Sequence, residues 1–70
     1  MMPLIYADSG TTVTIKKITG KTEVKQFLEK LGFTVGCDVT VVSSAGGNLI
    51  VQMKESRVAL SRETAGKIMV

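Results

Sequence analysis

The chain has 70 residues, with nine Lys and Arg against six Asp and Glu, which gives a formal charge of +3 at pH 7. Hydrophobic residues make up 44% of the composition and charged residues 21%, a balance that can bury a core and excludes wholesale disorder. There is no histidine and a single cysteine, Cys37, which excludes an internal disulfide, a zinc finger and a Cys–His or Ser–His catalytic pair.

The length predicts one domain over residues 1–70, because chains of this size rarely divide into two cores. Such a domain buries only roughly 60% of its unfolded surface, which leaves no room for a substrate pocket wrapped by several layers. No general acid–base pair is placed on a plausible cleft. We therefore expect a protein that is not an enzyme.

Targeting signals are absent from the sequence as given. No apolar run approaches the roughly 18 residues that cross a bilayer, and the start, Met1–Ala7, has no basic flank and is too short for a signal sequence. The lone cysteine fits a reducing compartment. We expect a cytoplasmic protein whose role at a membrane, if it has one, comes through a partner.

The segment Thr12–Lys16 alternates polar and apolar residues, with Val13 and Ile15 on one face. This alternation predicts a half-buried strand. The phase breaks at Lys17-Ile18, where a bulge or a strand end brings Ile18 back toward the core.

After Gly20 the hydrophobic period changes to that of a helix. Apolar residues fall at i, i+3, i+4 and i+7 in Val24, Phe27, Leu28 and Leu31. This spacing predicts a short amphipathic helix whose stripe, Phe27 included, faces the core. A helix of about ten residues is marginal alone, so we expect it to dock on a sheet.

The ends of this helix carry matching signals. Thr22 is a candidate N-cap and Glu23 follows in the first turn, whereas Lys30 lies in the last turn, where the helix dipole favours a cation. Gly32 stands at the position after the helix that is free to take a positive φ, and Phe33 can then fold back on the helix face.

The second half of the sequence predicts short strands separated by turns. In chain order these are a turn at Gly36, strand Asp38–Ser43, hairpin loop Ser44–Asn48, strand Leu49–Lys54, a tight turn at Glu55-Ser56, strand Arg57–Ser61, one helical turn over Ser61–Gly66 capped by Ser61, and final strand Lys67–Val70. The inward residues are Val39, Val41, Leu49, Val51, Met53, Val58 and Leu60. The final strand is expected to pair with the first, which removes two exposed edges. The fold class is mostly β, a small SH3-like five-stranded barrel with a short α-helix inserted after the first strand.

Several stretches carry a resemblance to a known family. They are Val13–Gly20, then Phe27–Val42 with its Leu-Gly-Phe-x-x-Gly-x-x-Val-x-Val-Val pattern, Gly47–Val51, and Arg57–Leu60 with the late Ala65 and Ile68–Val70. From about Leu4 to Val70 the chain resembles the FeoA family, the small cytosolic partner of the bacterial ferrous iron transporter FeoB. The same SH3-like domain occurs at the C-terminus of iron-dependent repressors. The pattern is a signature of a fold more than of a chemistry.

The resemblance has two departures. Many members of the family have proline before the second glycine of the pattern, where this chain has Val35. The loop Ser44–Asn48 is short, whereas relatives often carry a longer loop with a proline. The first difference affects the rigidity of the turn, and the second removes a candidate partner-binding loop.

Candidate metal ligands are few. Cys37 has only Asp38 beside it, and neighbours on a strand point to opposite faces, so a half-buried structural cysteine is favoured over a metal or redox site. The carboxylates are Asp8, Glu23, Glu29, Asp38, Glu55 and Glu63; their spacing favours solvated surface groups over a cation site. No metal site residue, catalytic residue or cofactor-binding residue is assigned, no cofactor is firmly implied, and binding of Fe²⁺ or another divalent transition metal is expected to be weak at most.

The remaining candidates also have plain structural explanations. Met53 and Met69 lie in predicted strands and are expected to pack in the core rather than to act as thioether ligands. Gly46-Gly47 lacks the Lys-Ser/Thr and the helix of a phosphate loop, and Tyr6 alone does not make a proline-peptide groove. The basic residues Lys16, Lys17, Lys21, Lys25 and Lys30 are spread over a strand, a turn and a helix, which favours a solvated basic face over a nucleic-acid site.

Three hypotheses for function follow. The resemblance implies an accessory or regulatory protein of ferrous iron uptake that contacts the cytosolic part of FeoB. The alternatives are a stand-alone transition-metal-binding module and a small barrel that binds nucleic acid. The hydrophobic residues Val42 and Ile50 are expected to be exposed, which would favour a homo-oligomer.

Overall fold

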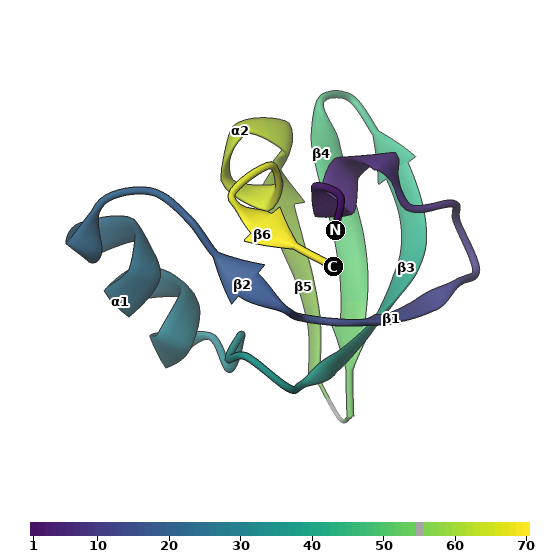
Figure 1. The fold of residues 1–70 in the computed structure, drawn as a ribbon. Coiled ribbons are helices and arrows are strands. Elements are labelled where there is room, and N and C mark those ends of the chain that lie inside the picture. The colour runs from purple at the N-terminus through teal and green to yellow at the C-terminus, as the bar shows by residue number, and fades with distance from the viewer. Residues whose placement is uncertain (55) are drawn as a thin grey trace.

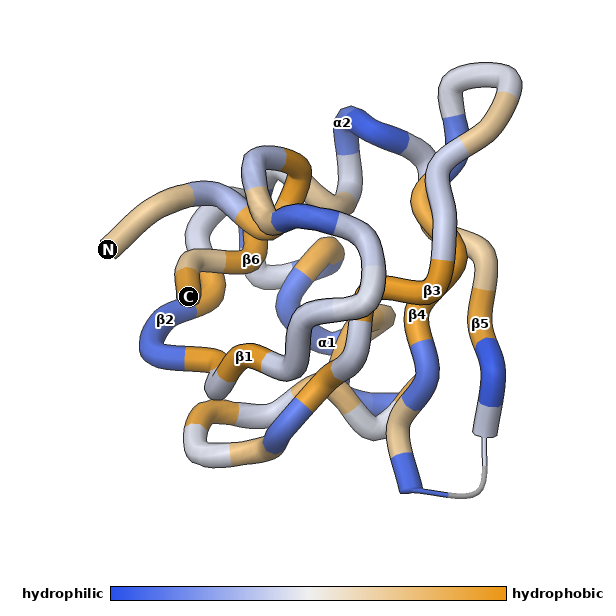
Figure 2. The backbone as a smooth tube through the Cα atoms, turned by 90° about the vertical axis from the view of Figure 1, so that its right-hand side faces the viewer, coloured by the Kyte–Doolittle hydropathy of each residue, from blue (hydrophilic) through white to orange (hydrophobic). Residues whose placement is uncertain are grey.

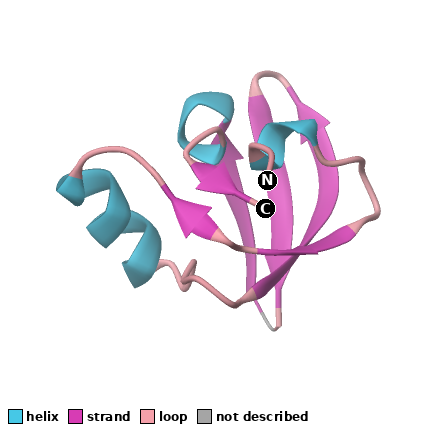
Figure 3. Ribbon diagram, viewed as in Figure 1, coloured by secondary structure: helices cyan, strands magenta, loops and turns pink. Residues whose placement is uncertain are grey.

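The structure is a computed structural model that describes residues 1–54 and 56–70. The strands are β1 (Thr12–Thr14), β2 (Lys17–Ile18), β3 (Asp38–Ala45), β4 (Asn48–Met53), β5 (Ser56–Ser61) and β6 (Ile68–Met69). The helices are η1 (a 3₁₀ turn, Leu4–Tyr6), α1 (Thr22–Lys30) and α2 (Arg62–Ala65). Figures 1 and 3 show the long strands side by side, with α1 standing to one side of them. The mostly β class with a helix between strands agrees with the sequence prediction.

The larger sheet has four antiparallel strands in the order β1-β3-β4-β5. The register shifts between Val41 and Ser43, so Val42 is the extra residue of a β-bulge. The β3–β4 hairpin turns through Gly46 and Gly47, which both have positive φ, +57° and +82°, the conformation that two-residue hairpin turns need. The expected loop Ser44–Asn48 is therefore too long, because its outer residues continue the ladder.

The smaller sheet pairs β2 with β6. The final strand thus meets the segment after the first strand rather than the first strand itself, and the prediction of one closed five-stranded barrel is wrong in this respect. The phase break explains the difference: the Ile15 N–H still donates to the Cys37 oxygen beside β3, whereas the next N–H, of Lys16, donates to the Met69 oxygen at 2.8 Å. One chain segment therefore serves both sheets.

The N-terminal segment closes one end of the structure, which the sequence did not predict. Leu4 in η1 is fully buried, and Met2 and Val70 exchange two backbone hydrogen bonds of 2.9 and 2.8 Å. Pro3 also bridges to Met69. The two ends of the chain lie together in Figure 1 because of this pairing.

The core collects apolar side chains from nearly every element. Its buried members are Leu4, Ala7, Ile15, Leu28, Phe33, Val39, Val41, Leu49, Val51, Met53, Leu60, Ala65, Ile68 and Val70. All the predicted inward residues of the second half are among them except Val58, which packs against the core half-buried. Figure 2 shows the matching hydrophobic stretches in β3, β4 and β6. Ile18 is also partly buried against the core, so the predicted phase break is confirmed.

Helix α1 ends as the sequence predicts. Gly32 has φ +99°; its N–H donates to the Glu29 oxygen, and the Phe33 N–H donates to the Leu28 oxygen, both at 2.9 Å. This pair of bonds is a Schellman motif, and it turns Phe33 into the core, where it is fully buried. The start differs from the prediction, because Lys21 is the N-cap and makes no side-chain capping bond, whereas Thr22 is already helical.

The rotation of α1 about its axis corrects a second expectation. Leu28 is the only fully buried residue of the helix, with Val24 and Leu31 partly buried, and the Phe27 side chain is 53% exposed. Consecutive helix residues point about 100° apart, so burial of Leu28 leaves Phe27 on the flank. Because α1 stands at the side of the molecule (Figure 1), only a narrow line of it docks.

Helix α2 begins at the predicted cap. The Ser61 hydroxyl accepts a hydrogen bond from the Thr64 N–H at 3.1 Å, which satisfies a donor at the helix start. The expected turn at Glu55-Ser56 lies in part outside the described residues, since Glu55 is not described, and Ser56 begins β5.

Candidate functional site

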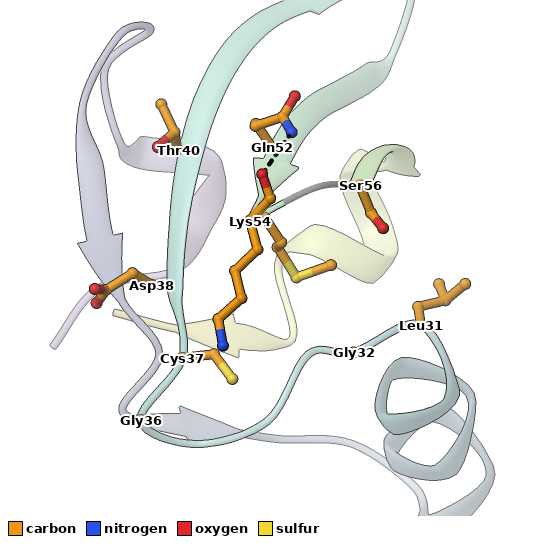
Figure 4. Close-up of a pocket in the computed structure, with 10 residues that line it drawn as sticks. Leu31, Gly32, Gly36, Cys37, Asp38, Thr40, Gln52, Lys54 and Ser56 are labelled. Carbon is orange, nitrogen blue, oxygen red and sulfur yellow. Dashed lines mark hydrogen bonds between the residues drawn. The ribbon is translucent and has the colours of Figure 1, made fainter.

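An open groove lies between the C-terminal end of α1 and the strands β3 and β4. It is lined by Leu31, Gly32, Gly36, Cys37, Asp38, Thr40, Gln52, Met53, Lys54 and Ser56. Figure 4 shows these side chains, with the Lys54 ammonium group reaching toward the Cys37 thiol. This groove is the first place to look for chemistry, because it holds the only thiol of the chain.

Cys37 lies half-buried directly before the first residue of β3. Its Sγ atom is hydrogen bonded to the Thr34 hydroxyl at 2.8 Å. This bond and a bond from the backbone of Thr34 lower the pKa of the thiol, and the positive charge of Lys54 lowers it further; partial burial and the charge of Asp38 act in the opposite direction. The thiol is thus more acidic than a free cysteine.

Asp38 does not join Cys37 in a ligand pair. Its Oδ1 accepts a hydrogen bond from the Thr14 hydroxyl at 2.7 Å, which ties β1 to β3. Figure 4 shows its carboxylate on the opposite side of β3 from the thiol. The alternation of a strand therefore separates the two candidate ligands, as expected from their adjacency.

The other carboxylates are dispersed. Asp8, Glu23, Glu29 and Glu63 are all exposed, and Glu55 lies outside the described residues. Among residues 1–54 and 56–70, no three His, Cys, Asp or Glu side chains come together in a way that could hold a metal ion. The described part of this chain therefore offers a transition metal no built ligand set within one copy.

The other sequence candidates do not form a site. Met53 packs in the core as expected, whereas Met69 is only half-buried in β6 and is not among the core residues, so the prediction for Met69 is wrong. Gly46-Gly47 forms the hairpin turn described above. Tyr6 is 66% exposed on η1.

The exposed apolar residues differ from those expected. Val42 and Ile50 are half-buried, so the expectation that they are exposed is wrong. The large hydrophobic side chains at the surface are Met1, Met2, Tyr6, Phe27 and Val35. Sequence reasoning missed Phe27 because spacing does not give the rotation of a helix. Val35 carried a signal, since it stands directly before Gly36, where the sequence predicts a turn.

The five lysines of the predicted basic face divide into two sets. Lys16, Lys17 and Lys25 line a second open groove between α1 and β2, whereas Lys21 and Lys30 do not. The sequence placed these residues on separate elements, and the packing of α1 beside β2 brings three of them to one surface.

Comparison with known proteins assigns the chain to a family. The FeoA domain model matches residues 2–70. A curated relative, the putative Fe(2+) transport protein A of Methanocaldococcus jannaschii, is 36% identical over all 70 residues, which cover 85% of its length. The chain belongs to the FeoA family. The resemblance read from the sequence is thereby confirmed.

Solved structures confirm the fold. A crystal structure of an iron uptake regulatory protein, FeoA, matches with a TM-score of 0.87 and 27% identity over 96% of this chain and 89% of that one. The zinc complex of FeoA from Stenotrophomonas maltophilia, described as an SH3 domain protein, matches with a TM-score of 0.85 and 24% identity over 99% and 88% of the two chains. The SH3-like fold of the FeoA family is therefore that of this chain. None of the helices in the described residues has the length and hydrophobicity needed to cross a membrane.

Proposed function

We propose that this chain is a non-enzymatic accessory protein of ferrous iron uptake that acts in the cytoplasm by binding the cytosolic part of a FeoB-like transporter. One observation carries this proposal: the FeoA domain spans residues 2–70, and the relative that is 36% identical over the full chain is named a putative Fe(2+) transport protein.

The side chains support action by contact rather than by chemistry. The described residues hold no cluster of three metal-ligating groups, and the sequence has no histidine. Exposed apolar groups such as Tyr6, Phe27 and Val35 provide surface that a protein partner can cover. Each copy is expected to bind transition-metal ions only weakly, with a dissociation constant of about 1 mM or more, the loose end of the affinity scale.

The direct test is a binding measurement with the purified cytosolic domain of a FeoB-like transporter from the same organism. It is made by pull-down and calorimetry, with GDP, with a GTP analogue and without nucleotide, each with and without Fe²⁺. Binding in at least one nucleotide state is expected. Absence of binding in every state contradicts the proposal.

A metal titration separates the main alternative. Fe²⁺ is added anaerobically to the chain alone, and the amide shifts are followed by NMR. Weak, unsaturated shifts are expected; a saturable site with a dissociation constant of about 1 µM would instead favour a stand-alone metal-binding module.

A further inference from the structure

The groove between α1 and β2 is separate from the thiol groove and is made by three segments. Its volume is about 640 Å³. Its lining residues come from the segment Lys16–Ile18, from α1, which contributes Lys25 and Glu29, and from the loop that carries Val35. The strand segment, one side of α1 and the loop before β3 therefore each supply part of the wall.

The charge of this groove is strongly one-sided. Lys16, Lys17 and Lys25 are exposed and face one exposed carboxylate, that of Glu29. In a regular strand Lys16 and Lys17 would point to opposite faces. They line the same groove here because the chain passes from one sheet to the other at this point, which breaks the alternation. The break in alternation at Lys16 and Lys17 therefore also concentrates positive charge in this groove.

The groove also has an apolar part. Val35 is 65% exposed, and Ile18, which lines the same groove, is half-buried. An aliphatic surface among ammonium groups suits a ligand that carries both carboxylates and an aliphatic side chain. Of the three aromatic residues of the sequence, Tyr6, Phe27 and Phe33, none lines the groove. Since single-stranded nucleic acids bind through stacking on aromatic rings, this lining favours a polypeptide over a nucleic acid.

Two of the three walls of the groove are joined by backbone hydrogen bonds. The Gly36 N–H donates to the Ile15 oxygen at 2.8 Å, and the Ile15 N–H donates to the Cys37 oxygen at 2.9 Å. These two bonds tie the loop that carries Val35 to the strand segment that carries Lys16. A ligand therefore meets a surface that is already ordered, which lowers the entropic cost of binding.

We propose that this groove is a docking site for an acidic segment of a partner protein, with carboxylates paired to Lys16, Lys17 and Lys25 and an aliphatic side chain seated on Val35. The inference rests on the proposed function only for the identity of the natural partner. The site itself follows from the charge and shape of the groove.

The probe is a short synthetic peptide of glutamates with a central leucine, titrated into the ¹⁵N-labelled chain at low salt. Shifts are expected at the amides of Lys16, Lys25 and Val35, and they should weaken as salt is added. The double variant Lys16→Glu/Lys25→Glu should bind the peptide about tenfold more weakly, because two attractive pairs become repulsive.

A matched control has the same net charge. The variant Lys30→Glu/Arg62→Glu changes two exposed cations outside the groove. It should bind the peptide within about twofold of the wild type when the variants are compared at about 0.15 M salt, where the Debye length is about 8 Å and distant surface charges are screened. The variant Val35→Ser should weaken binding of the leucine peptide about threefold and leave an all-glutamate peptide unaffected, which identifies the apolar contact.

Three outcomes overturn the inference. They are an absence of shifts at the amides of Lys16, Lys25 and Val35, a loss of peptide affinity in the control variant equal to that in Lys16→Glu/Lys25→Glu, and tighter binding of an oligothymidylate than of the peptide. The binding experiment with the FeoB domain distinguishes a failure of the docking site from a failure of the proposed function. If the FeoB domain binds the wild type and Lys16→Glu/Lys25→Glu equally, the docking site is wrong and the proposed function stands. If the peptide binds in the groove but the FeoB domain does not bind the chain, the docking site stands and the proposed function is wrong.

Discussion

The two phenylalanines of the chain should differ sharply in what they contribute to stability. Phe33 is fully buried beyond the end of α1, whereas Phe27 is 53% exposed on the flank of the same helix. We consider the replacement of each by alanine. The comparison tests the rotation of α1, which is one of the structural features that the sequence did not reveal.

The magnitudes follow from burial. Phe33→Ala leaves a cavity in the core and should cost about 3–5 kcal/mol, which is comparable with the free energy of unfolding of about 4–10 kcal/mol expected for a domain of this length. Full burial of a phenylalanine contributes about 1.5–3 kcal/mol, so the buried half of Phe27 contributes about 1 kcal/mol. The higher helix propensity of alanine returns about 0.5 kcal/mol. The net cost of Phe27→Ala is about 0.5 kcal/mol.

Urea denaturation followed by circular dichroism measures both changes. With a slope of about 1 kcal/mol per M, Phe27→Ala should lower the midpoint by about 0.5 M and leave the slope unchanged. If Phe33→Ala does not fold, Phe33→Leu, with a cost of about 1.5 kcal/mol, keeps the comparison measurable. A midpoint for Phe27→Ala at or below that of Phe33→Leu would show that α1 docks through Phe27 and would refute the placement.

Three further predictions concern turns, caps and the thiol. Gly32→Ala should destabilise the fold by about 1–2 kcal/mol in the same urea assay, because φ is +99° there and an L side chain is strained at such angles. Ser61→Ala removes a capping bond and should cost about 1 kcal/mol, whereas Thr22→Ala should be nearly neutral because Thr22 is not the N-cap; equal costs would contradict the observed start of α1. Thr34→Val should raise the pKa of the Cys37 thiol, because the hydrogen bond with the Thr34 hydroxyl lowers that pKa more than any other contact does. The midpoint of the pH profile of iodoacetamide alkylation should move to higher pH, and an unchanged midpoint would rule that contact out.

Local features of the fold were predictable from the sequence because they depend on residues close together in the chain. The Schellman motif at Gly32, the cap of α2 at Ser61 and the turn at Gly46-Gly47 each use a few neighbouring residues whose backbone angles and hydrogen bonds leave little choice. The alternation of apolar residues likewise placed Val39 and Val41 in the core. The family pattern Leu-Gly-Phe-x-x-Gly consists largely of these same local signals.

The candidate sites were only partly predictable. Because Cys37 and Asp38 are adjacent, the sequence already predicted that their side chains point apart. The lack of histidine also argued against a metal site. The basic groove could not be foreseen, because Lys16, Lys17 and Lys25 come together only through the docking of α1 beside β2. Nor did the sequence indicate that the thiol of Cys37 and the ammonium group of Lys54 share one groove.

What the sequence alone determined is therefore most of the strands, the helix α1 with its C-terminal end, the cap of α2 and the inward faces of β3 and β4. Tertiary structure alone decided the rotation that exposes Phe27, the burial of Leu4 under the paired chain ends, and the division of strand partners that leaves β6 on β2 instead of closing one barrel. The physical reason is the range of the interactions. Backbone chirality and capping bonds act within a few residues, whereas docking and strand exchange depend on how all the elements share one small core, where the alternatives differ by only a few kcal/mol.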